Sequence, residues 1–394
     1  MEMRNYICLM SVWTLIVSSC KKPYSPPAIT VNNNYLVVEG VIDAGTDSTV
    51  IKLSRTVNLS GQTALNPEKN ATVTVQGDQN ASYSLSETAG GRYVSAPLNL
   101  DNTHKYRLFI TTADGRIYAS NYEGVKETPP IDTLGYMITN DGLSLYINTH
   151  DPANNTHYYR WDYAETYLYF SPLTSYYKYI DYPFYYTQRS VRRLPSEYIN
   201  TCYITNNSTT VLLNSSAKLA QDMINQTPIT QVPKDSEKIF YRYTINVKQY
   251  ALTPEAYEFW TLLKKNTEKL GTIFDPQPSE AKTNLYCVSN PSEPVIGYMS
   301  VSTVSQKRIF IDRTELPVWP FSPPECNPLY ASWMKKGYID SNLPDSVYIP
   351  LGPIESEYIP ALNDTAYSVK VGYYDCVDCR YHLHGKTQKP AFWK

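Results

Sequence analysis

The chain has 394 residues, of which 42% are hydrophobic and 18% are charged, and its formal net charge is −2. It can therefore bury a sizeable core, which excludes an intrinsically disordered protein. The charge also argues against a general nucleic-acid-binding protein, which needs clustered positive charge. The 37 tyrosines favour strands and the 28 prolines favour loops. The composition thus indicates a mainly β protein of two or three domains, at roughly 100–200 residues per domain.

The first 27 residues have the form of a leader and a tether. Residues 1–19 resemble a signal peptide, because their apolar stretch is shorter than the roughly 20 residues that span a bilayer. Val17-Ser-Ser-Cys20 matches the aliphatic–small–small–Cys lipobox of bacterial lipoproteins. We predict cleavage before Cys20, lipidation of its sulfur, and a proline-rich tether over residues 20–27. The alternative is an ordinary secretory signal with a chance cysteine.

Beyond the leader, the cysteines indicate at least one disulfide. The tail contains Cys376-Val-Asp-Cys379 followed by two histidines, which on spacing alone also resembles half of a zinc site. A second, similarly spaced pair of ligands is missing, so we expect no metal. We favour instead a disulfide from Cys326 to either Cys376 or Cys379, since a lipoprotein lies outside the reducing cytoplasm.

Residues 28–126 predict an N-terminal β-sandwich of the Ig-like or transthyretin-like kind. Tyr106, Leu108 and Ile110 alternate with polar residues, and Asp114-Gly115 is a strong hairpin signal. Short strands with turn signals every 8–12 residues are typical of a sandwich.

Residues 127–394 predict a larger β-rich domain with a few inserted helices. One helix is expected near 216–225, where apolar residues recur at helical spacing. A second is expected over 254–270, because Thr253 is a good N-cap and Pro254 suits the first helical position. Residues 316–360 are rich in proline and are expected to be irregular.

Eleven tyrosines lie between residues 158 and 186. Tyrosine combines a large flat apolar area with a polar group and little rotamer entropy, which suits recognition surfaces. The alternative is that these rings pack half into the core of a strand pair, and the two interpretations are evenly balanced. The loop-like part from 171 to 193 is the better surface candidate. The candidate binding residues are Tyr176, Tyr177, Tyr179, Tyr182, Tyr185, Tyr186 and Arg189.

The sequence contains no recognisable catalytic constellation. Ser215 and Lys218 match an SxxK pattern but lack its companion motifs, so we interpret Ser215 as a helix cap. Asp275 is the acid that a hydrolase hypothesis would examine first. We expect no catalytic residues and no cofactor.

Several short blocks are spread over nearly the whole mature chain: Leu36-Val-Val-Glu-Gly40, Val247-Lys-Gln-Tyr250, Ala256-Tyr-Glu-Phe-Trp260, Phe274-Asp-Pro-Gln-Pro278, Val295-Ile-Gly-Tyr298, Cys376-Val-Asp-Cys379 and Pro390-Ala-Phe-Trp393. In this combination they resemble a known family, the Bacteroidota outer-membrane lipoproteins called domain of unknown function 4249. The resemblance implies an envelope location and, as partner, a TonB-dependent outer-membrane receptor. It supplies no catalytic residues.

The expected function is therefore that of a lipid-anchored outer-membrane accessory protein that helps a TonB-dependent receptor capture a nutrient of unknown identity. The alternative is a structural or assembly component of an envelope complex without a small ligand, and a hydrolase is the less favoured third hypothesis. Lys21-Lys22 stands where surface-exported members of this phylum carry acidic residues. The periplasmic face and the cell-surface face of the outer membrane therefore both remain as alternatives for the location of the protein.

Overall fold

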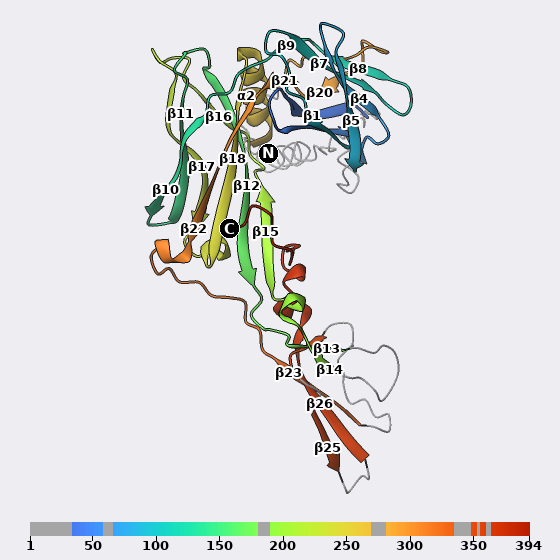
Figure 1. Ribbon diagram of the computed structural model, residues 1–394, viewed down its shortest axis with the longest axis vertical. Helices are drawn as coiled ribbons and strands as arrows, with labels where there is room; N and C mark the ends of the chain where they lie inside the picture. Colours follow the sequence, from blue (N-terminus) through green and yellow to red (C-terminus); the bar gives the residue numbers. More distant parts are fainter. Residues whose placement is uncertain are drawn as a thin grey trace, which may run out of the picture.

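The computed structural model describes residues 34–57, 66–179, 190–268, 281–334, 348–352, 355–359 and 364–394. The molecule is elongated (Figure 1). A β-rich lobe and a β-sandwich lie side by side at one end, and a narrow arm forms the other end. Among the described residues the fold is mainly β, which confirms the predicted class. No helix in these ranges combines the length and the apolarity needed to cross a bilayer.

The first lobe is built from one twelve-stranded sheet that curls until its two ends, β19 and β20, contact each other. The alternation predicted from the sequence is confirmed, since Tyr106, Leu108 and Ile110 are all buried in its core. The hairpin at Asp114-Gly115 is confirmed too, with Phe109 opposite Ala119. The strands are β1 (Leu36–Asp43), β2 (Ser48–Arg55), β3 (Asn66–Pro67), β4 (Thr72–Gly77), β5 (Ser82–Ala89), β6 (Arg92–Pro97), β7 (Lys105–Thr111), β8 (Ile117–Ser120), β9 (Glu123–Gly124), β19 (Leu285–Cys287), β20 (Val295–Ile296) and β21 (Ser300–Ser302).

Three strands of this sheet come from much later in the chain. β20 and β21 pair in parallel with β1, and β19 pairs antiparallel with β8. Residues 285–302, which the sequence assigns to the second domain, therefore complete the first sheet.

The second unit is a sandwich of a three-stranded and a five-stranded sheet. Both sheets contribute to one core, whose largest side chain is the fully buried Trp161. The Trp161 indole Nε1–H donates to Gln249 Oε1 at 2.8 Å. The strands are β10 (Ile131–Thr139), β11 (Gly142–His150) and β17 (Met223–Pro233) in one sheet, and β15 (Thr201–Asn207), β12 (Tyr158–Phe170), β16 (Leu212–Ser215), β18 (Arg242–Ala251) and β22 (Val304–Asp312) in the other.

The helix predicted near 216–225 was wrong. Residues 216–222 form turns and bends, and β17 begins at Met223. Two residues of the supposed apolar face are exposed, Leu219 at 56% and Met223 at 55% of their full exposure, whereas Ile224 is buried as part of β17. Ser215 accordingly caps no helix: it ends β16, and its Oγ accepts from the Ala217 backbone N–H in a turn. Pairing of β17 with β11 prevails over local helix propensity here.

The helix predicted over 254–270 is confirmed as α2 (Pro254–Glu268), and its last two predicted residues lie outside the described ranges. The Ala256 N–H donates to Thr253 Oγ1 at 3.2 Å, which is the expected N-cap bond. The buried face of α2 packs against Val41 and Tyr298 of the first lobe and Tyr250 of the second, so α2 fastens the two units together.

A further four-stranded sheet projects from the sandwich and forms most of the narrow arm (Figure 1). Part of the region expected to be irregular, 316–360, is therefore strand. The sheet consists of β23 (Leu329–Met334), β24 (Tyr348–Pro350), β25 (Glu355–Ile359) and β26 (Asp364–Tyr373), followed by the short α3 (Tyr374–Val377). Beside it lies a small hairpin of β13 (Tyr177–Tyr179) and β14 (Ser190–Arg192), and β13 contacts β24. Short 3-10 turns occur at η1 (Pro195–Glu197), η2 (Glu237–Ile239), η3 (Arg313–Glu315) and η5 (Cys379–Tyr381).

Candidate functional site

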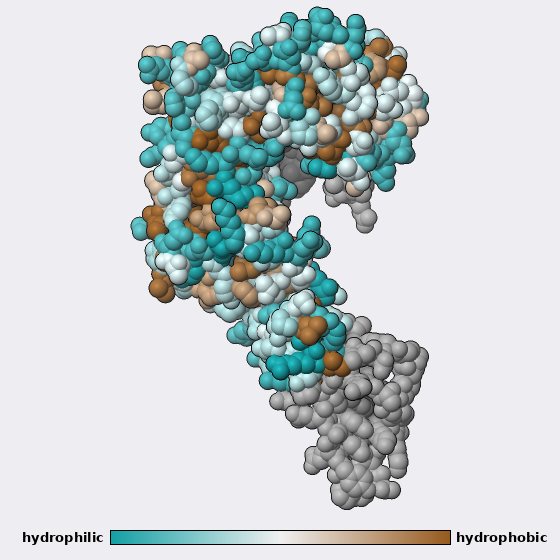
Figure 2. Space-filling view, in the orientation of Figure 1, coloured by the Kyte–Doolittle hydropathy of each residue, from teal (hydrophilic) through white to brown (hydrophobic). Residues whose placement is uncertain are grey.

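The candidate site is the end of the molecule that carries the tyrosine-rich hairpin. We call the hairpin β13–β14 and the sheet β23–β26 the distal arm, and the segments 193–202 and 374–386, the second of which begins with α3, its neck. In the space-filling view, isolated hydrophobic side chains lie on the neck among hydrophilic ones (Figure 2). The large hydrophobic residues exposed in the neck and at its edge include Tyr176, Leu194, Tyr381 and Leu383. Hydrophobic residues that are exposed singly are common on protein surfaces, so the recognition hypothesis depends on the tyrosines of the hairpin.

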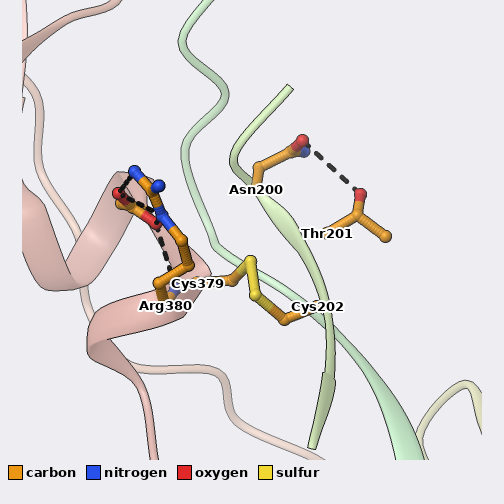
Figure 3. Close-up of a disulfide and its surroundings, with 6 residues drawn as sticks. Asn200, Thr201, Cys202, Cys379 and Arg380 are labelled. Carbon is orange, nitrogen blue, oxygen red and sulfur yellow. Dashed lines mark hydrogen bonds and ion pairs between the residues drawn. A yellow bond between two sulfur atoms is a disulfide. The ribbon is translucent and has the colours of Figure 1, made fainter. Parts of the chain in front are cut away.

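Two disulfides fasten the neck. Cys326 is bonded to Cys376, with their Cα atoms 5.7 Å apart, which confirms the prediction of a bond from Cys326 to the CxxC pair. Cys379 is bonded to Cys202 at the start of β15, with a Cα–Cα distance of 5.6 Å. Figure 3 shows the sulfurs of Cys202 and Cys379 meeting between β15 and the short helical turn, while Arg380 points to the other side of that turn. The sequence did not reveal Cys202 as a partner, because 177 residues separate the two cysteines.

Both sulfurs of the CxxC motif are thus bonded to other parts of the chain. Among the described residues no group of three or more His, Cys, Asp or Glu side chains is arranged to hold a metal ion. Cys287, in the core of the first lobe, is a buried free thiol.

Backbone hydrogen bonds reinforce the neck next to each disulfide. The Cys379 N–H donates to Ile199 O at 2.9 Å, and the Leu173 N–H donates to Cys376 O at 2.9 Å. Ile199 and Leu173 also pack against the small hydrophobic cluster that contains Cys376. The arm is therefore joined to the sandwich by covalent bonds, hydrogen bonds and apolar contacts together.

Side chains lock the base of the hairpin. Arg193 Nε donates to Ser175 Oγ at 3.1 Å and to Tyr177 O at 3.2 Å, which crosslinks the two strands where they leave the neck. Lys178 forms an ion pair with Glu197 of η1. The hydrogen bond from Lys178 is the largest cause that lowers the pKa of the Glu197 carboxyl, so this carboxyl stays ionised to more acidic pH.

The structure describes some of the predicted binding residues. The Tyr176 ring is 47% exposed and meets Tyr198 edge-on, with ring centroids 6.0 Å apart. Tyr177 is half-buried in β13, opposite Arg192. The backbone of Tyr179 lies in β13, but its side chain lies outside the described part. Tyr182, Tyr185, Tyr186 and Arg189 lie outside the described residues, as does Cys20.

The tyrosines of β12 follow the packing interpretation. Tyr159, Tyr167 and Tyr169 are buried on the face that forms the sandwich core. Burial raises the pKa of Tyr169 to about 12, and Tyr167 donates to Glu237 at 2.8 Å. These rings are therefore structural, and the recognition hypothesis concerns the hairpin alone.

The polar groups near the SxxK pattern form a closed buried network. Ser216 is fully buried and donates to Asp222, which also accepts from Tyr159, and His157 Nδ1 lies 3.2 Å from Ser216 Oγ. The serine here lies between the histidine and the acid, whereas in a catalytic triad the histidine lies between the other two. Lys218 is exposed. This network stabilises the turn before β17. Asp275, the acid named for the hydrolase hypothesis, lies outside the described residues.

The chain was compared with models of known protein families. The family model described as domain of unknown function (DUF4249) matches residues 21–308, which include both β units and end within β22. The sheet β23–β26 and the CxxC motif follow the matched region. No curated protein matches the chain.

Proposed function

The chain belongs to the DUF4249 family, and from that premise we propose that it is a lipid-anchored accessory protein of the outer membrane. In this proposal Cys20 carries the lipid, and the distal arm contacts a TonB-dependent receptor that takes up a nutrient.

The observation that carries the proposal is the separation of the two ends. The described chain begins next to β1, in the lobe at one end of the long axis, whereas β13 and β14 lie toward the other end (Figure 1). A lipid at Cys20, joined to β1 by a short tether, would hold the first lobe at the membrane. The arm would then project away from the lipid surface, where a partner can reach it.

The chemistry of the hairpin supports a recognition role. Its base is fixed by Arg193 and by the Lys178–Glu197 ion pair, and its neck by two disulfides. A rigid support lowers the entropy that is lost when a partner binds. Tyrosine adds contact area at little further entropic cost.

Mild-detergent isolation of the full-length lipidated protein from membranes tests the proposal. Replacement of Tyr176, Tyr177, Tyr185 and Tyr186 by Ala should reduce the recovered receptor several-fold while the melting temperature stays nearly unchanged. The matched control is Tyr286→Ala, which removes a ring that is 41% exposed on β19 in the first lobe, away from the hairpin.

Three outcomes contradict the proposal. Equal recovery of the receptor with the quadruple variant refutes the role of the hairpin. Recovery of a scaffold or secretion complex in place of a receptor favours the structural alternative. An unmodified Cys20 thiol in the mass spectrum of the native product refutes the lipid anchor.

A further inference from the structure

A second candidate site lies at the opposite end of the molecule from the arm, where the first lobe meets α2. A cavity of about 400 Å³ opens there, which is within the size range of small-molecule sites. Three parts of the chain form its walls: residues 121–123, which lead into β9, one face of α2, and residues within 282–298, around β19 and β20. The lining residues are Asn121, Glu123, Glu255, Glu258, Phe259, Leu262, Lys282, Thr283, Asn284 and Tyr298.

One side of the cavity is held in place by hydrogen bonds. Asn284 is only 6% exposed, and its Nδ2 donates to Glu123 Oε1 at 2.9 Å and to Met299 O at 2.8 Å. The Met299 N–H donates back to Asn284 Oδ1 at 2.9 Å. The amide of Asn284 is therefore fixed in one orientation, and it positions the Glu123 carboxylate in the cavity wall.

The charge of the cavity is unbalanced. Three carboxylates and one ammonium group line it: Glu123 is half-buried, whereas Glu255, Glu258 and Lys282 are exposed. Within the part of the chain that the structure describes, none of the three carboxylates has a cation within ion-pair distance. Burial is the largest cause that raises the pKa of the Glu123 carboxyl, and Glu255 raises it further. Walls of low dielectric strengthen the negative potential of such a cleft.

The arrangement does not suit a metal ion. No three acidic or histidine side chains among the described residues converge on one point. The carboxylates instead share the cavity with apolar and aromatic walls, since Phe259 and Tyr298 are nearly buried there beside Leu262. The cavity therefore joins carboxylates to an apolar wall, in which the half-buried Leu262 is the more accessible side chain.

We propose that this cavity binds a small organic cation, with its amine or guanidinium group near Glu123 and its apolar portion against Phe259, Leu262 and Tyr298. Such a ligand supplies the missing positive charge and covers the apolar wall at once. The proposal does not rest on the role of the arm, because the cavity lies in the other end of the molecule.

Calorimetric titration of the full mature chain tests this inference. The probe is phenethylamine, and its neutral counterpart 2-phenylethanol has nearly the same shape. We expect the amine to bind at least about tenfold more tightly than the alcohol, and added salt to weaken the amine alone.

Variants assign the binding to the cavity. Glu123→Gln keeps an oxygen that can accept from Asn284 and removes the charge, so it should weaken amine binding about tenfold, with Glu258→Gln in the same direction. Glu325→Gln, an exposed acid in the segment before the neck, is the matched control and should leave the affinity unchanged. Melting temperatures verify that each variant is folded.

Each alternative result overturns the proposal. Absence of amine binding at millimolar concentration, equal affinity for the alcohol, or full affinity in Glu123→Gln each refutes the organic-cation site. Calcium binding that is lost in Glu123→Gln shows a metal site in its place. Loss of receptor recovery in the hairpin variant has no bearing on these measurements, so the two proposals fail separately.

Discussion

Gln249 joins three parts of the molecule, and its replacement by Leu should be strongly destabilising. The side chain is fully buried, accepts from the Trp161 indole at 2.8 Å, and donates to Pro129 O at 2.8 Å and to Thr149 Oγ1 at 2.9 Å. It therefore connects β18 to β12, to β11 and to the segment between the two units. Leu has a similar volume, so the cost comes mainly from groups that lose their partners.

The magnitude follows from counting these groups. Gln249→Leu leaves the Trp161 N–H and the Pro129 carbonyl unpaired, whereas Thr149 keeps its bond to Pro130 O. At about 1–3 kcal/mol for each unpaired buried group, the free energy of unfolding should fall by about 4 kcal/mol. Trp161→Phe should cost about 2–3 kcal/mol, because it leaves Gln249 Oε1 unpaired and opens a small cavity.

The double variant measures the interaction between the two side chains. With both changed, no indole N–H is left unpaired, so the double loss should be smaller than the sum of the single losses by at least about 1 kcal/mol. Urea unfolding followed by far-ultraviolet circular dichroism gives all three values. The control is Gln231→Leu, because Gln231 is exposed on β17. Additive losses within about 0.3 kcal/mol, or a cost below about 1 kcal/mol for Gln249→Leu, would refute the reasoning.

Two further predictions concern the neck and the pH dependence. Replacement of both Cys202 and Cys379 by Ser should lower the free energy of unfolding by about 2–4 kcal/mol, and an unchanged urea midpoint of the tryptophan fluorescence contradicts it. The hydrogen bond that His150 donates to Asp132 is the largest cause that raises the pKa of His150 above 6.5. This contact therefore stabilises the folded protein fully below that pH, and its contribution is lost as pH rises through the raised pKa. Asp132→Asn should remove this pH dependence and lower the His150 pKa in an NMR titration; an unchanged titration curve rules the contact out.

The parts of the fold that the sequence predicted depend on local patterns. The alternation of Tyr106, Leu108 and Ile110 fixes which face of β7 is buried. Thr253 and Pro254 mark the start of α2 through capping, which needs only neighbouring residues. The predicted disulfide from Cys326 to one of the two cysteines of the CxxC motif was confirmed, with Cys376 as the partner. The prediction was possible because two cysteines close together in sequence narrow the choice of partner.

The parts that failed depend on contacts between distant segments. The spacing of the apolar residues around Leu219 and Met223 is that of a helix. Asp222, however, belongs to a buried hydrogen-bond network with Tyr159, which lies some 60 residues earlier in the chain. The parallel pairing of β21 with β1 places Val41 opposite Ser300, and no local sequence pattern predicts this pairing. The cavity beside Glu123 was missed for the same reason, since its walls come from three separate parts of the chain.

The late arrival of β19, β20 and β21 in the first sheet has a consequence for biosynthesis. A ribosome that has completed β8 must add more than 150 further residues before the strands that flank β1 and β8 exist. Throughout that interval two strand edges offer unpaired N–H and C=O groups to any neighbouring polypeptide. A fragment that stops near residue 126 should therefore associate with itself. In the nascent chain, a chaperone must cover these strand edges until residue 302 has emerged.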